Sequence, residues 1–352
     1  MISADDLRAA VGSGLISEAQ AASLKSLSDS RRGAREALDP GDEPFELFKG
    51  FNEIFIVIGL FILTSGWVTM NAALVATDIL NIQSHLVTAS LIGAVFVWIV
   101  SEYFIRVRRM VAPAIALSII FAGNAAIGFS AHFEQPSMIA QDDLSSLPLA
   151  LVLTVLALGV YWWRFRVPFI MALMALGLFA IVLIIGADRA GVPTDLADIF
   201  LLSAQGPLAW MTLAVGLAVF AAAMAFDMSD PHRVTRRAAQ GFWLHIVAAP
   251  ALVNTIALSL LNQDRVGLLW GVLFGFALIA IIIDRRSFLI TAIAYIVTLT
   301  FALFEGDGAG TPVLLLGLFL VTLGAFWARI RAWVLLPLSP ILPLDRLPPS
   351  HS

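Results

Sequence analysis

The stretch FNEIFIVIGLFILTSGWVTM, from Phe51 to Met70, decides the fold of this chain. Its twenty residues include a single charged residue, Glu53. A helix rises about 1.5 Å per residue, so a helix of this length crosses the roughly 30 Å hydrocarbon core of a bilayer. The sequence therefore predicts a membrane-spanning helix here, preceded by a polar, charge-rich segment.

The composition points to the same class of protein. Hydrophobic residues make up 60% of the 352 residues and charged residues 13%, against about 25% charged in soluble domains. The formal net charge of -4 gives no reason to expect nucleic acid as a partner. Cysteine is absent, which excludes disulfides, thiolate metal sites and a cysteine nucleophile. The first residues do not read as a cleaved signal peptide, so the first span is expected to act as the targeting signal.

Apolar runs long enough to cross a membrane recur about ten times after residue 50, and they predict an all-α, polytopic membrane bundle. The runs are Phe51 to Met70, Leu86 to Phe104, Val111 to Ser130, Leu147 to Trp163, Val167 to Gly186, Pro207 to Phe226, Gly241 to Leu261, Val266 to Ile283, Phe288 to Phe304 and Pro312 to Ala328. Tight, Arg-containing turns between several runs favour a string of antiparallel hairpins.

Basic residues gather in every second connection and before the first span. If both termini are cytoplasmic, about nineteen of the 21 basic residues lie inside, and Arg189 and Arg265 lie outside. This positive-inside bias predicts a multi-pass protein of a bacterial inner membrane with both termini in the cytoplasm.

Residues 1–27 predict a cytoplasmic arm of two short helices joined by a glycine turn. The second helix begins after Ser17, which forms a capping box with Gln20. The apolar stripe of the pair is thin, so we expect the arm to dock on the membrane domain, on a second copy or on a protein partner. The arm is followed by a charged linker (28–50), the membrane domain (51–330) and a Pro-rich cytoplasmic tail (331–352).

The arm segment Gly14-Leu15-Ile16-Ser17-Glu18, followed by many short hairpins with Arg-rich inner turns, resembles a group of bacterial predicted multi-pass membrane proteins classed as a domain of unknown function. The resemblance implies a cytoplasmic helical pair ahead of a tandem array of spans. It implies no catalytic or binding residue, and the charged linker departs from the pattern of the group.

Polar groups within spans are the first candidates for function, because they are costly in lipid. In the seventh run Pro250 predicts a kink, and Asn254 lies one turn further on the same face. His245 lies about 180° around the helix from Asn254. The functional interpretation is a hinge or solute contact, and the structural one is a proline kink with Asn254 bonding across a helix interface.

Other polar groups allow weaker hypotheses. Glu53, Glu102 and His245 lie near the predicted cytoplasmic boundary and would form a proton-responsive group if they converged. Asn71 and Asn124 lie at similar depth and could pair, and Tyr295 could line a central cavity with Asn124 and Asn254. Gly267, Gly271 and Gly275 form a small-residue stripe that predicts close helix packing. The sequence predicts no catalytic residue, cofactor or metal site, and membrane lipid is the one partner that its composition requires.

Two classes of function remain open at this level. The arm favours a membrane scaffold or regulatory subunit that recruits a partner. The alternative is a transporter-like or channel-like protein for a small neutral or lipidic solute around the seventh span. The absence of charges at the centre of the spans disfavours transport of charged solutes.

Overall fold

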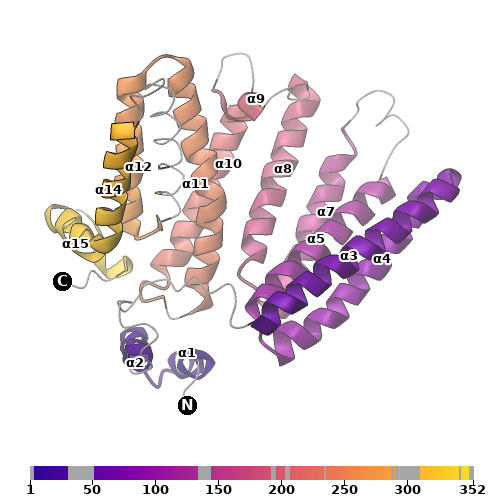
Figure 1. The fold of residues 1–352 in the computed structure, drawn as a ribbon, viewed down its shortest axis with the longest axis horizontal. Helices are drawn as coiled ribbons and strands as arrows, with labels where there is room; N and C mark the ends of the chain where they lie inside the picture. Colours follow the sequence, from indigo (N-terminus) through magenta and orange to yellow (C-terminus); the bar gives the residue numbers. More distant parts are fainter. Residues whose placement is uncertain are drawn as a thin grey trace. The chain divides into compact units, whose positions relative to one another are not determined.

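The computed structural model describes residues 4–30, 51–133, 144–191, 196–202, 207–233, 235–286, 289, 293, 310–340 and 342–348. Every regular element in these ranges is a helix, so the predicted all-α class is confirmed for them (Figure 1). The chain divides into two compact units. Unit 1 comprises 1–43, 200–202 and 216–352, and unit 2 comprises 44–199 and 203–215.

Within the described part of the chain, eight helices are long and apolar enough to cross a membrane, so the chain is a multi-pass membrane protein. Each coincides with one of the first eight predicted runs. They are α3 (Phe51–Thr77), α4 (Ile82–Ser101) continued by the π-helical η2 (Glu102–Val107), α5 (Val111–Phe133), α7 (Leu147–Phe165), α8 (Ile170–Ala190), α10 (Leu208–Met228), α11 (Arg236–Asn262) and α12 (Val266–Ile283).

The last two predicted runs have different outcomes. The run from Phe288 to Phe304 falls almost wholly outside the described residues. The final run corresponds to α14 (Gly310–Ala325), whose second half is bent by 81° from α15 (Trp327–Leu338). Counting this bent pair as one span gives nine spans in the described residues, where about ten were predicted for the whole chain. The predicted boundary between membrane domain and tail falls inside α15, which contains Pro337.

Unit 2 is built around α5. Helices α3, α4 and α7 pack on α5, and α8 packs on α7. Aromatic rings fill the contact: Tyr161 is fully buried and stacks on Phe121, with ring centroids 4.5 Å apart, and Trp98 meets Tyr161 edge to face. The Tyr161 hydroxyl lies 2.6 Å from the Ser101 hydroxyl, so the polar end of this buried ring is satisfied.

Unit 1 contains the arm and the helices that follow residue 216. Helices α11 and α12 pack along each other, α15 packs on α12, and α14 packs on α15 (Figure 1). The arm consists of α1 (Ala4–Gly12) and α2 (Glu18–Ser30), joined through Gly14 at a φ of +73°. The predicted capping box is confirmed, because Ser17 N–H donates to Gln20 Oε1 (2.9 Å) and Gln20 N–H donates to Ser17 Oγ (3.2 Å).

Candidate functional site

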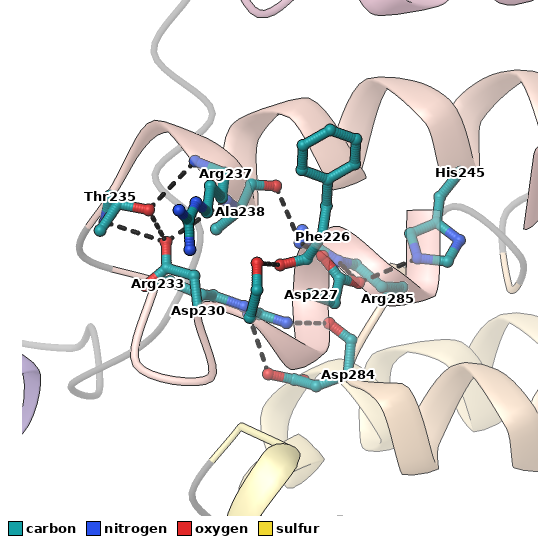
Figure 2. Close-up of polar contacts among 11 residues, drawn as sticks. Phe226, Asp227, Asp230, Arg233, Thr235, Arg237, Ala238, His245, Asp284 and Arg285 are labelled. Carbon is teal, nitrogen blue, oxygen red and sulfur yellow. Dashed lines mark hydrogen bonds and ion pairs between the residues drawn. The ribbon is translucent and has the colours of Figure 1, made fainter. Parts of the chain in front are cut away.

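A buried charge cluster, formed by Asp227, His245 and Arg285, lies in unit 1 (Figure 2). Asp227 comes from the last turn of α10, His245 from α11, and Arg285 directly follows the C-cap of α12. Their exposed fractions are 6%, 0% and 1%. Charged side chains are almost never this deeply buried unless they are paired, so the cluster is the strongest candidate for a functional site in the described residues.

The carboxylate of Asp227 is the centre of this cluster. Its Oδ2 lies 2.9 Å from Nε2 of His245 and accepts a 2.9 Å hydrogen bond from Nε of Arg285. Its Oδ1 accepts a second hydrogen bond from Nη2 of Arg285, so the guanidinium binds the carboxylate in a bidentate manner. An ionised carboxylate only accepts, so Nε2 of His245 carries the proton in this arrangement.

A glycine makes room for the cluster. A β-carbon placed on Gly241 would lie 2.2 Å from Asp227 Oδ1 and 3.2 Å from the backbone oxygen of Ala223. Gly241 lies one helical turn before His245, on the same face of α11. The absence of a side chain at this position therefore lets α10 approach α11 closely enough for Asp227 to reach His245.

The connection between α10 and α11 adds a second carboxylate. Asp230 Oδ2 accepts from the backbone N–H of Thr235 (2.9 Å), from its hydroxyl (2.7 Å) and from the N–H of Ala238 (3.3 Å). Thr235 is the N-cap of α11, and its Oγ1 accepts from the N–H of Arg237. Asp230 and Thr235 thus satisfy the first donors of α11 and place negative charge at its positive end.

A third carboxylate, Asp284, ties α12 to α15. It is the left-handed C-cap of α12, forms an ion pair with Arg233 (3.0 Å) and accepts from the indole N–H of Trp327 (2.6 Å). Arg331 of α15 donates to the backbone oxygens of Ile281 (3.1 Å) and Ile282 (3.3 Å). Cationic side chains interact favourably with the negative, carbonyl end of a helix dipole. Arg331 therefore helps to hold α15 against the end of α12.

The charges of this region balance. Three carboxylates, those of Asp227, Asp230 and Asp284, lie among three guanidinium groups, those of Arg233, Arg285 and Arg331. Desolvation lowers the pKa of Arg285 to about 9, which still leaves the guanidinium charged at neutral pH.

Two other predicted candidates have partners of their own. Glu53, in unit 2, accepts from the backbone N–H of Ala112 at 3.2 Å. Glu102, also in unit 2, pairs with Arg106 (3.1 Å) and Arg164 (2.8 Å). These partners are separate from Asp227, the partner of His245, so the hypothesis that Glu53, Glu102 and His245 form one proton-responsive group has no supporting contact among the described residues.

The asparagines bond within their own helices. Asn71 donates to Trp67 O and Asn124 donates to Ile120 O, both at 2.8 Å, and no bond joins the two asparagines within the described part of the chain. A β-carbon on Gly93 of α4 would lie 2.1 Å from Asn124 Oδ1, so Asn124 marks the close approach of α4 to α5. This agrees with a packing role.

The remaining candidates lie in α11, in α12 and beyond. Pro250 lies inside α11, which continues through it to Asn262, and Asn254 is half-buried. Tyr295 falls outside the described residues. The stripe of Gly267, Gly271 and Gly275 has no described heavy atom within 4 Å of its β-carbon positions. No described helix therefore makes the close approach predicted there, and the tight glycine contacts of unit 1 occur at Gly216 and Gly241 instead.

Sequence reasoning found His245 but missed its two partners. Asp227 falls one residue beyond the predicted end of the sixth run, and Arg285 was counted as one more basic residue of an inner turn. Reading the acids in the same turns, in FDMSD (226–230) and IDRR (283–286), would have provided the missing signal. In the described ranges no group of three or more histidine or acidic side chains is arranged to hold a metal ion.

Comparisons with protein-family models, curated proteins and solved structures gave no match for this chain.

Proposed function

We propose that this chain is a regulatory membrane subunit that recruits a protein partner through its N-terminal arm. The observation that carries the proposal is that the arm has one buried face and one exposed face with apolar residues. Leu15, Leu24 and Leu27 are exposed (79%, 44% and 56%), whereas Ala21 and Ala22 of the same helix pair are buried. Exposed leucines in a polar segment provide apolar contact area for a partner.

Acidic residues of the arm lie against the connection between α10 and α11. Asp5 lies 3.9 Å from Arg236, and Glu18 lies in the electrostatic environment of Asp230, His232 and Arg237. An ion pair such as that of Asp5 with Arg236 contributes at most about 1 kcal/mol at a surface. A partner that binds the exposed leucines of the arm can compete with this ion pair.

The experiment combines site-specific crosslinking with matched variants of the full chain. A photoreactive amino acid at Leu15, Leu24 or Leu27 is expected to capture one recurrent protein in cells. The double variant L24D/L27D should lose that protein, whereas the control L24M/L27M, which keeps the surface apolar, should retain it. Equal capture by both double variants would contradict the proposal.

Transport of a small neutral or lipidic solute around α11 is the second candidate. The observation that favours it is the polar content of this membrane helix, with His245 in the buried charge cluster and Asn254 half-buried two and a half turns further along. Asn254 would then lie on a path open to water.

The absence of native cysteine makes this alternative testable. A single cysteine at Asn254, in proteoliposomes, would react with a small water-soluble maleimide if such a path exists. A single cysteine at the exposed residue Ser229 is the positive control. An unreactive Asn254→Cys beside a reactive Ser229→Cys would remove the transport candidate.

A further inference from the structure

An apolar groove with a cation at one end lies in unit 1, next to the buried charge cluster, because Phe220 in its lining meets His245 edge to face with ring centroids 5.5 Å apart. It is a shallow, open groove of about 620 Å³, and its walls come from α10, from the residue that follows it and from the short helix η4 (Leu344–Arg346). Phe220, Ala221, Met224, Ala225, Met228, Ser229 and Arg346 line it.

The floor of the groove is one face of α10. Phe220, Met224 and Met228 recur every four residues and are half-buried, while Ala221 and Ala225 beside them are exposed. The neighbouring face of α10 carries Val219, Ala223 and Asp227, which are buried. Since α10 is long and apolar enough to cross a membrane, this floor suits a hydrocarbon chain.

The end of the groove is polar and positively charged. Ser229 is exposed, but its hydroxyl donates to Phe226 O at 2.7 Å and so has no hydrogen left for a ligand. Arg346 is exposed, and its backbone N–H bonds to Pro343 O at 3.0 Å, which holds the η4 turn. The guanidinium fork of Arg346 is therefore the donor group that this end of the groove offers, and such a fork matches a phosphate.

We propose that this groove binds an anionic phospholipid, with the lipid phosphate on Arg346 and one acyl chain along Phe220, Met224 and Met228. A free phosphate would leave the apolar floor uncovered, and a lipid without net negative charge would leave the charge of Arg346 uncompensated. The site uses no residue of the arm, so it stands independently of the proposed recruitment function.

The test is native mass spectrometry of the full chain released from nanodiscs that contain equal parts of phosphatidylglycerol and phosphatidylcholine. The unmodified chain is expected to retain phosphatidylglycerol preferentially. R346Q should weaken that retention about tenfold, the effect of losing one charge-assisted contact. R329Q is the matched control, because Arg329 is also an exposed arginine of unit 1 but lies outside the groove. M224W, which fills the floor, should lower retention of both lipids.

Three results would overturn the proposal. R346Q and R329Q could retain phosphatidylglycerol equally, which would reduce the effect to general surface charge. M224W could leave retention unchanged, which would show that no chain lies on α10. Inorganic phosphate at millimolar concentration could displace the lipid from the unmodified chain, which would identify a site for soluble phosphate.

Discussion

Asp227 and Arg285 pair in a site that excludes water almost completely. Burying either ion alone would carry a large desolvation penalty, and the two hydrogen bonds between the ions offset it. His245 adds a third hydrogen-bonding group to the same carboxylate. Such a pair fixes the relative positions of α10, α11 and the end of α12 more than it adds net stability, because a buried ion pair and its desolvation cost nearly cancel.

Removing one charge of this pair is therefore expected to be severe. D227N keeps the size of the side chain but leaves the guanidinium of Arg285 buried without its counter-charge, and it should lower the free energy of unfolding by about 3–5 kcal/mol. The double variant D227N/R285Q should cost less than D227N alone, because no uncompensated charge remains. Circular dichroism during titration with sodium dodecyl sulfate in mixed micelles measures both.

The control for that series is D264N, because Asp264 is exposed at the connection between α11 and α12. It should change the free energy of unfolding by no more than about 0.5 kcal/mol. If D227N were as mild as D264N, the pairing of Asp227 with Arg285 would not hold in the folded protein.

Gly241 allows a second test at the residue scale. G241A places a methyl group 2.2 Å from Asp227 Oδ1, so α10 and α11 must move apart or Asp227 must leave His245. The expected loss of stability is about 1–3 kcal/mol. G59A, on an exposed helical glycine of α3 with open space around it, should be neutral or stabilising by up to about 1 kcal/mol. Equal effects of the two variants would contradict the close packing inferred at Gly241.

At the scale of elements, residues at the helix ends and in the connections help to hold neighbouring helices together. Arg166 and Asp284 take the left-handed conformation at the C-caps of α7 and α12, and Arg233 takes it in the connection before α11. This conformation is costly for residues other than glycine, so surrounding contacts must maintain it. Asp284 and Arg233 bind each other, which shows how the two connections stabilise one another.

The arm gives a prediction that depends on pH. Burial, and after it the nearby Asp230, raises the pKa of Glu18 above its ordinary value of 4.5 when the arm is docked. A carboxyl with a raised pKa binds its proton more tightly in the docked state, so docking is favoured at low pH and weakens as the pH rises above 4.5 through the raised value. Hydrogen exchange of residues 4–30 at pH 5 and pH 7.5, corrected for the intrinsic rate, measures this.

Two variants separate this effect from general charge. E18Q should hold the arm docked at both pH values, because it removes the ionising group. D5N removes the partner of Arg236 and should loosen the arm at pH 7.5. A loosening of the arm by E18Q would show that the charge of Glu18 favours docking, which a raised pKa of Glu18 in the docked state contradicts.

At the scale of the whole molecule, the distribution of arginine predicts how the chain lies in the membrane. The connection between α10 and α11 and the end of α12 should face the cytoplasm, and the connection between α11 and α12 should face outward. A single cysteine at Ser229 should therefore react with an impermeant maleimide only after the cells are permeabilised. A single cysteine at Gln263 should react in intact cells, and the reverse pattern would invert the proposed orientation.

The sequence by itself determined the class of protein and most of its helices. Long apolar runs have one stable solution in a bilayer, because every backbone N–H and C=O must bond within its own helix. The capping box of the arm was equally readable, since it depends on residues three apart in the chain. Local rules of this kind need no knowledge of the fold.

The tertiary structure alone decided which polar groups meet. Asp227, His245 and Arg285 are separated by 18 and 40 positions along the chain, and nothing in their spacing pairs them. Which glycines allow close helix packing also depends on the tertiary structure. Gly241 faces an oxygen of Asp227, whereas the regular stripe that begins at Gly267 meets no described neighbour. Periodicity tells which residues share a face of one helix, but the identity of the opposing face depends on how the helices pack.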